Sequence, residues 1–184
     1  MKKRIFTTTI LLSFLFSNII ISDSVEASRT NFAEENLKLP DLSNKKIIDS
    51  FYNHSFKYRG ITTDYSKKYL LNKWGNANEV QKSKVNKIIS ENFIYGKNKN
   101  VVINVVSNSE IVNSSKVLSM TINDKNSNYK FSELYPLYKD NFQKVQRNNK
   151  IYLSNDYFSI TFEKKYKTYY ATKLSYYSYS SFLE

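Results

Sequence analysis

The stretch Phe158-Ser-Ile-Thr-Phe162 alternates apolar and polar side chains, which is the pattern of a β-strand with one buried and one solvated face. A matching apolar alternation lies earlier in the chain, at Val101, Ile103 and Val105, with an offset of 57 in the numbering. The same offset relates Ile94-Tyr95 to Ile151-Tyr152, Asn98 to Asn155, and Lys116 to Lys173. Lys, Tyr, Asn and Ser are abundant enough to match by chance, but the shared apolar alternation favours an internal duplication.

A second pair of matching segments precedes these strands. Residues Ser66–Lys73 align with Ser132–Lys139 at an offset of 66, and both have apolar residues at helical spacing. The two offsets differ by nine, which predicts extra chain between helix and sheet in the first copy, around Lys82–Ser90. We therefore predict an α+β fold with two tandem units, each a helix followed by a three-stranded antiparallel sheet.

The beginning of the chain has the three parts of a secretory signal peptide. These are a basic start at Lys2–Arg4, an apolar run over 10–21 and a cleavage pattern at Val25-Glu-Ala27. A membrane anchor is the alternative, but polar residues interrupt the run, which is shorter than the roughly 20 residues of a bilayer span. We predict a signal peptide at 1–27 and a secreted, extracellular mature chain, Ser28–Glu184, without membrane insertion.

Sequence patterns divide the mature chain into three parts. Residues 28–42 are polar with scattered apolar side chains, which predicts a mobile N-terminal arm. Residues 43–125 form the first predicted unit, which begins with an extra helix over Ser43–Tyr52, and residues 126–184 form the second unit. The abundance of Lys, Asn, Ile and Tyr is typical of Gram-positive bacteria with AT-rich genomes.

One resemblance to a known family covers the C-terminal part of the chain, from Ser132 onward. It rests on Ser132-Glu-Leu-Tyr-Pro-Leu-Tyr, Ile151-Tyr152, Tyr157–Phe162 and Thr172-Lys-Leu-Ser, which together resemble the C-terminal unit of the immunodominant staphylococcal antigen B family. The resemblance implies a small, basic, virulence-associated secreted protein that binds nucleic acid without sequence specificity and has no known catalysis. Asp140-Asn141 departs from that family's glycine after the helix. The doubled plan also resembles the tandem repeats of the beta-lactamase-inhibitor-protein-like fold.

Composition excludes several classes of active site. The chain has no Cys, one His and three Gly, so it lacks thiol nucleophiles, Cys-based zinc sites, disulfides and phosphate-binding glycine loops. His54 lies near Asp49 and Asp64 in sequence, but no G-x-S-x-G motif supplies a serine nucleophile. The carboxylates are scattered among lysines rather than paired. We therefore predict no catalytic residues, no metal and no cofactor, and a protein that is not an enzyme.

The positive signal is a group of lysines interleaved with tyrosines. The formal net charge is +12, and it falls to +11 when the signal peptide, with three basic and two acidic residues, is removed. Lysines neutralise phosphates, and tyrosine rings stack on unpaired bases for about 1–3 kcal/mol per base. The ordinary alternative is a solvated strand rim, since Lys and Tyr are common there. The predicted polyanion-binding residues are Lys164, Lys165, Tyr166, Lys167, Tyr169, Tyr170 and Lys173, with Lys97 and Lys99 from the first hairpin.

Two functions of different classes remain open from the sequence. The first is a secreted, basic binding protein for polyanions, with nucleic acid as the expected partner. The alternative is a secreted protein-binding module, an inhibitor or a ligand of a host protein, that uses a Tyr-rich sheet surface. A high positive charge also favours association with anionic cell-surface polymers without any specific function.

Overall fold

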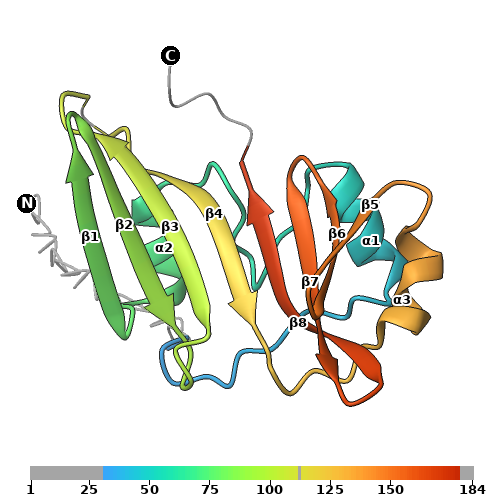
Figure 1. The fold of residues 1–184 in the computed structure, drawn as a ribbon. Coiled ribbons are helices and arrows are strands. Elements are labelled where there is room, and N and C mark those ends of the chain that lie inside the picture. The colour runs from blue at the N-terminus through green and yellow to red at the C-terminus, as the bar shows by residue number, and fades with distance from the viewer. Residues whose placement is uncertain (1–30, 112, 179–184) are drawn as a thin grey trace, which may run out of the picture.

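The computed structural model describes residues 31–111 and 113–178, so the predicted signal peptide lies outside the described residues. Eight antiparallel strands form one sheet in the order β1-β2-β3-β4-β8-β7-β6-β5 (Figure 1). The strands are β1 Glu79–Val85, β2 Ile88–Tyr95, β3 Val101–Asn108, β4 Lys116–Asn123, β5 Gln143–Arg147, β6 Lys150–Asn155, β7 Phe158–Lys165 and β8 Thr168–Tyr177.

Three eight-residue helices cover one face of this sheet, which lies behind the strands in Figure 1. They are α1 Lys45–Tyr52, α2 Lys67–Trp74 and α3 Phe131–Tyr138. The core lies between helices and sheet, where Leu70 and Trp74 of α2 and Leu134 and Tyr138 of α3 are buried. The opposite face of the sheet carries no helix among the described residues, and we call it the open face.

The predicted fold class is wrong. The protein is a β-rich fold with one eight-stranded sheet, rather than two helix-plus-three-strand units. The missed strands are β1 and β5, which lie at the two edges of the sheet. Their side chains are almost all exposed and strongly polar, so they lack the apolar alternation that identifies an inner strand. The same exposure explains why Glu79–Ser90, which holds β1 and the start of β2, has no clear strand signal.

The strand order nevertheless has an internal two-fold symmetry. Each of α2 and α3 precedes four strands, and the central pair β4–β8 joins the two halves. Thr121 pairs with Ser175 in the middle of this junction. A register shift lies between Asn104 and Val105 in β3, and another lies at the equivalent place in β7, between Thr161 and Phe162. The apolar alternation that opens the sequence analysis therefore marks two equivalent strands.

The predicted offsets hold for β3 and β7 but not for their neighbours. Phe93 pairs with Ile103, and Leu153 pairs with Ile160, so β2 and β6 are related by an offset of 60 rather than 57. In the helices the buried positions Leu70 and Leu134 are related by an offset of 64 rather than 66. The length difference is spread over strands and hairpin loops, and no nine-residue insertion exists around 82–90, because β1 and β2 already fill that stretch.

The described part of the predicted mobile arm is packed against the core. Leu37 and Leu42 are buried, and Phe32 stacks on Trp74 with ring centroids 4.8 Å apart. The backbone is held too, since Asn100 Nδ2 donates to the Leu37 carbonyl at 2.7 Å. Residues 31–42 are therefore a structural segment. Its apolar residues are too sparse to predict a helix or strand from the sequence, yet they are the residues of this segment that are buried in the core.

The leading helix does not belong to the first unit either. Phe51 of α1 stacks on Phe158 of β7 at 3.8 Å, and Tyr52 contacts Phe142 at 5.1 Å. The chain then returns to the first half, where Tyr58 packs against Trp74 at 6.1 Å. The predicted boundaries at 43–125 and 126–184 therefore cut through one continuous core.

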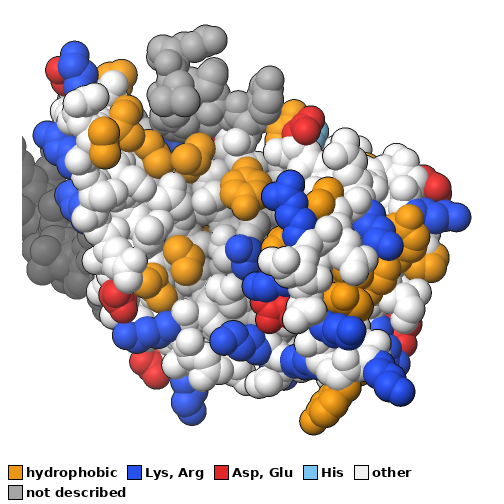
Figure 2. All heavy atoms as spheres, viewed as in Figure 1, with side chains coloured by type: hydrophobic (Ala, Val, Ile, Leu, Met, Phe, Trp, Pro, Cys, Tyr) orange, Lys and Arg blue, Asp and Glu red, His pale blue; other side chains and the backbone are white. Residues whose placement is uncertain are grey.

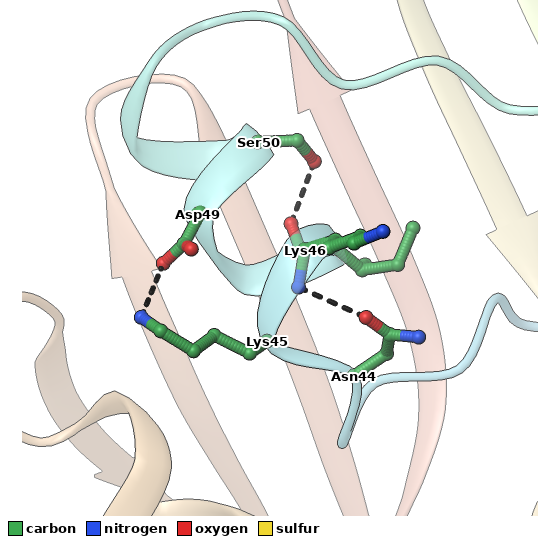
Figure 3. A network of polar contacts seen from close by, with 6 residues as sticks. Asn44, Lys45, Lys46, Asp49 and Ser50 are labelled. Carbon is green, nitrogen blue, oxygen red and sulfur yellow. Dashed lines mark hydrogen bonds and ion pairs between the residues drawn. The ribbon is translucent and has the colours of Figure 1, made fainter.

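Local hydrogen bonds fix where α1 begins (Figure 3). The Asn44 side chain accepts from the Lys46 amide at 2.9 Å, so Asn44 rather than Ser43 is the N-cap. Ser43 instead donates to the Asp41 side chain. The helix therefore starts at Lys45, and its Phe51 reaches the core.

Candidate polyanion-binding surface

The structure brings the two predicted groups of basic residues to the same end of the sheet. β2 and β7 run in the same direction, so the loop after β2 and the turn after β7 lie at one end, at the bottom of Figure 1. The first carries Lys97 and Lys99, and the second is flanked by Lys164, Lys165 and Lys167. Segments that are distant in sequence therefore share one surface.

Two further lysines lie at this end and escaped the sequence interpretation. Lys125 follows β4, and Lys150 begins β6, where it pairs with Glu163 of β7. The Lys165 ammonium donates to the Lys125 carbonyl, which ties the β7–β8 hairpin to the segment after β4. Each is isolated in sequence, so only the strand pairing could have found them. We call the end that carries Lys97, Lys99, Lys125, Lys150, Lys164, Lys165, Lys167 and Lys173 the basic end.

Most of the lysines at the basic end form no ion pair among the described residues. Lys99 pairs with Glu79 at 3.2 Å, and Lys150 pairs with Glu163 at 2.7 Å. Among residues 31–111 and 113–178, the other six lysines of the basic end form no ion pair. Figure 2 shows Lys and Arg side chains gathered over the lower part of β7 and β8.

The three predicted tyrosines differ in their availability. Tyr166 is 99% exposed at the tip of the β7–β8 turn. Tyr169 is half-buried against the core, and its hydroxyl accepts a hydrogen bond from Gln146 at 3.5 Å. Tyr170 is also half-buried, and the Lys165 ammonium lies 5.8 Å from its ring centroid. Only Tyr166 of the three therefore offers a free ring for stacking on a base.

A hollow of about 270 Å³ lies on the open face next to the basic end. Its floor is one cross-strand row, in which Tyr152 pairs with Thr161, Thr161 pairs with Lys173, and Lys173 pairs with Asn123. Directly opposed residues in an antiparallel sheet share a face, so these four side chains are neighbours. We call this space the three-lysine hollow; it is lined by Asn123, Lys125, Lys150, Tyr152, Thr161, Glu163, Thr172 and Lys173.

A second and larger hollow, of about 670 Å³, adjoins the first. The two share Asn123 and Lys125, and the second is otherwise rich in asparagine. Asn100 lies in its wall and donates to the carbonyls of Leu37 and Asn123, at 2.7 and 2.8 Å. The basic end therefore continues from the open face around the lower edge of the sheet.

Among the described residues, the equivalent place in the first half carries no charged side chain. There the symmetric cross-strand row contains Asn92, Asn104 and Ser119. Asn104 Nδ2 donates to Asn92 Oδ1 at 2.7 Å and to Ser90 Oγ at 2.8 Å, which satisfies the amide within the sheet. Lys150 and Lys173, which the second half contributes to the hollow, thus have no charged counterpart in the first half, although that half supplies Lys97, Lys99 and Lys125 to the basic end.

The tyrosines divide between the core and the surface of the sheet, and the Tyr-rich surface of a protein-binding module stays a prediction. Burial places Tyr58, Tyr95, Tyr138 and Tyr176 in the core. It raises the pKa of Tyr58 to about 12 and raises the pKa values of the other three as well. At the centre of the open face, Ser119, Thr121 and Asn123 of β4 lie opposite Tyr177, Ser175 and Lys173 of β8.

Two polar features elsewhere have structural explanations. His54 contacts the Tyr157 ring edge-on, with centroids 3.8 Å apart. Glu91 is 8% exposed and forms ion pairs with Lys67 at 2.7 Å and with Lys82 at 3.8 Å. No group of three or more His, Cys, Asp or Glu residues that could hold a metal ion occurs in the described part of the chain. Within the same residues, no helix has the length and apolar character needed to cross a membrane.

Comparison with known proteins adds little to this geometry. No protein-family model matches the chain, and no curated protein matches it in sequence. A solved structure with some similarity is a cysteine-rich secretory protein from Staphylococcus aureus subsp. aureus Mu50, at 12% identity and a TM-score of 0.33. The similarity covers 82% of this chain and 49% of that protein, so the chain spans about half of its length.

Proposed function

We propose that the protein is a secreted binder of polyanions that holds nucleic acid at the basic end of its sheet without reading base sequence. The observation that carries the proposal is the meeting of eight lysines from separate segments at one end, six of them without an ion pair among the described residues. A continuous surface of this kind suits a phosphate backbone, whose charges recur along the chain.

The residue types at the basic end support binding without sequence specificity. Lysine is a flexible point charge and lacks the planar fork with which arginine reads guanine. All eight residues that define the basic end are lysines, and Arg147 lies beside them, opposite Lys150 in the β5–β6 hairpin. Tyr166 at the hairpin tip adds a ring that can stack on any unpaired base. We therefore expect single-stranded and double-stranded nucleic acid to bind, with affinity dominated by counterion release.

The test is fluorescence anisotropy with mixed-sequence DNA at several salt concentrations. We expect log K to fall linearly with log salt, and the triple variant Lys164→Ala, Lys165→Ala, Lys167→Ala to reduce the slope by about 2–3. The matched control is the triple variant Lys57→Ala, Lys68→Ala, Lys84→Ala, which replaces three lysines outside the basic end. This control keeps the same total charge as the first variant, so it separates a local surface from a general effect of net charge.

Two results would contradict the proposal. One is the absence of DNA binding at low salt, and the other is an equal loss of affinity in the two triple variants. The second result would assign binding to overall charge. A partner protein captured at 1:1 stoichiometry and retained in high salt would instead support a protein-binding module.

A further inference from the structure

We propose that the three-lysine hollow is a subsite for one terminal phosphate, a phosphate monoester, at the end of a bound nucleic acid. This inference rests on the proposed function and adds a preferred chemical group to it. The hollow differs from the rest of the basic end because its lysines surround a space, whereas Lys164 and Lys167 lie at an exposed hairpin end.

The walls of the hollow come from three separate elements. Lys173 lies within β8, Lys150 begins β6, and Lys125 follows β4. Their side chains line the same space on the open face. Three ammonium groups supplied from different directions can contact different oxygens of one tetrahedral anion, which a single run of lysines along a strand cannot do.

The floor of the hollow is rigid and polar. Thr161 and Thr172 are 6% and 4% exposed. The Thr172 hydroxyl donates to the Thr161 carbonyl at 3.5 Å, which links β8 to β7 beneath the hollow. Sites built on strands hold their geometry better than sites on loops. The floor therefore lies within the sheet, and the longer lysine side chains line the space above it.

Size and charge favour a small dianion. The volume of about 270 Å³ is at or below the ~300–1,000 Å³ range of pockets for drug-sized molecules. Three lysines and Glu163 give the hollow a formal charge of +2. A phosphate monoester carries about −1.5 to −2 at pH 7, whereas each internal phosphodiester carries one negative charge. The charge balance thus favours the end of a strand over its interior.

Glu163 sets the selectivity of this hollow. Its hydrogen bond to Lys150 at 2.7 Å raises the pKa of that lysine and keeps the ammonium oriented along the wall. An incoming phosphate has to compete with the carboxylate for Lys150. A dianion competes better than a monoanion, so Glu163 discriminates against weakly charged groups. Tyr152, in the next position of the floor row, lies where the attached nucleoside would rest.

The experiment compares a tetranucleotide with and without a 5′-phosphate, by anisotropy or calorimetry at low salt. We expect the phosphorylated form to bind about tenfold more tightly, the gain of one or two charge-assisted hydrogen bonds. Lys173→Gln and Lys150→Gln should bring the ratio close to one. Glu163→Gln should raise affinity for both forms and narrow the difference between them.

Lys164→Gln is the matched control, because it removes a lysine of the basic end that does not line the hollow. It should weaken both tetranucleotides equally and leave the ratio unchanged. Circular dichroism melting shows whether each variant is folded, and Lys150→Gln, at an exposed position, remains informative if Lys173→Gln is unstable.

Failure of this inference is distinguishable from failure of the proposed function. A wild-type ratio of one, with long DNA still bound, would overturn the phosphate subsite and leave polyanion binding intact. A ratio that persists in Lys150→Gln and Lys173→Gln would also overturn it. O-phosphoserine is a further probe: weaker displacement by O-phosphoserine than by the phosphorylated tetranucleotide would identify a nucleic-acid end as the source of the phosphate, and no displacement by either would overturn the assignment.

Discussion

The hairpins β3–β4 and β7–β8 occupy equivalent places in the two halves of the sheet, yet their ends differ completely. The β3–β4 connection is a seven-residue loop, 109–115, with Glu110 as its charged residue. The β7–β8 connection is a two-residue turn within Lys164-Lys-Tyr-Lys167. The common architecture therefore supplies the hairpin twice, and the lysine-rich turn occurs in one of the two copies. In a protein with two similar halves, a feature that occurs in one half and not in the other is a candidate for a functional role.

The first prediction tests whether the halves fold together. Leu70 and Leu134 are equivalent core residues, 0% and 1% exposed. Each Leu→Ala substitution should cost about 2–5 kcal/mol of unfolding free energy, because it leaves a cavity. In denaturant titrations, the fluorescence of Trp74, a first-half residue, should report the loss from Leu134→Ala in the second half. A separate transition for the two halves would show that the single core does not make them cooperative.

A second difference between the halves lies under the helices. Lys67 and Glu91 form an ion pair at 2.7 Å, while the equivalent positions of the second half hold Phe131 and Ile151. Lys67→Met should lower the unfolding free energy by about 1–3 kcal/mol, because it removes the nearer partner of a buried carboxylate. Adding Glu91→Ile should restore most of the loss. If the double variant is as unstable as the single one, the ion pair has a role beyond neutralising Glu91.

The third prediction concerns the buried Tyr58 and the dependence of the unfolding free energy on alkaline pH. Burial raises the pKa of Tyr58 to about 12, above the ordinary value near 10. A tyrosine that stays neutral longer in the folded state stabilises it fully below pH 10, and this contribution is lost between about pH 10 and 12. Tyr58→Phe should therefore flatten the fall of unfolding free energy with pH by about 1.4 kcal/mol per pH unit. The control is the same comparison below about pH 9, where the Tyr58 hydroxyl is neutral in both states and the two slopes should agree.

The smallest expected effect concerns the tight turns. Asn86 and Asn148 have positive φ in the β1–β2 and β5–β6 turns, at 53° each, and Tyr166 has φ 56° in the β7–β8 turn. Asparagine tolerates this conformation better than a bulky residue. Tyr166→Asn should raise the unfolding free energy by about 0.5–1 kcal/mol and weaken single-stranded DNA binding. Unchanged affinity would show that the exposed ring does not stack on bases.

The sequence predicted the duplicated alternation of β3 and β7 because both strands lie inside the sheet with one face buried. It could not reveal β1 and β5, whose side chains are solvated on both faces at the sheet edges. The sequence also assigned Lys97 and Lys164 to one candidate surface. That assignment rests only on the local density of basic residues. Lys125 and Lys150 could not be found in this way, because each stands apart from other lysines in the sequence and strand pairing brings them to the basic end.

The place of β8 in the sheet sets the order in which the protein can be completed. It is the last described strand in the chain, yet it lies in the centre and is the partner through which β4 meets the second half. The segment 31–58 must also wait, because Phe51 and Phe56 pack against Phe158 and Tyr176. The segment 31–58 therefore finds its partners in the last two described strands, β7 and β8. The native core cannot be completed before β8 has been synthesised.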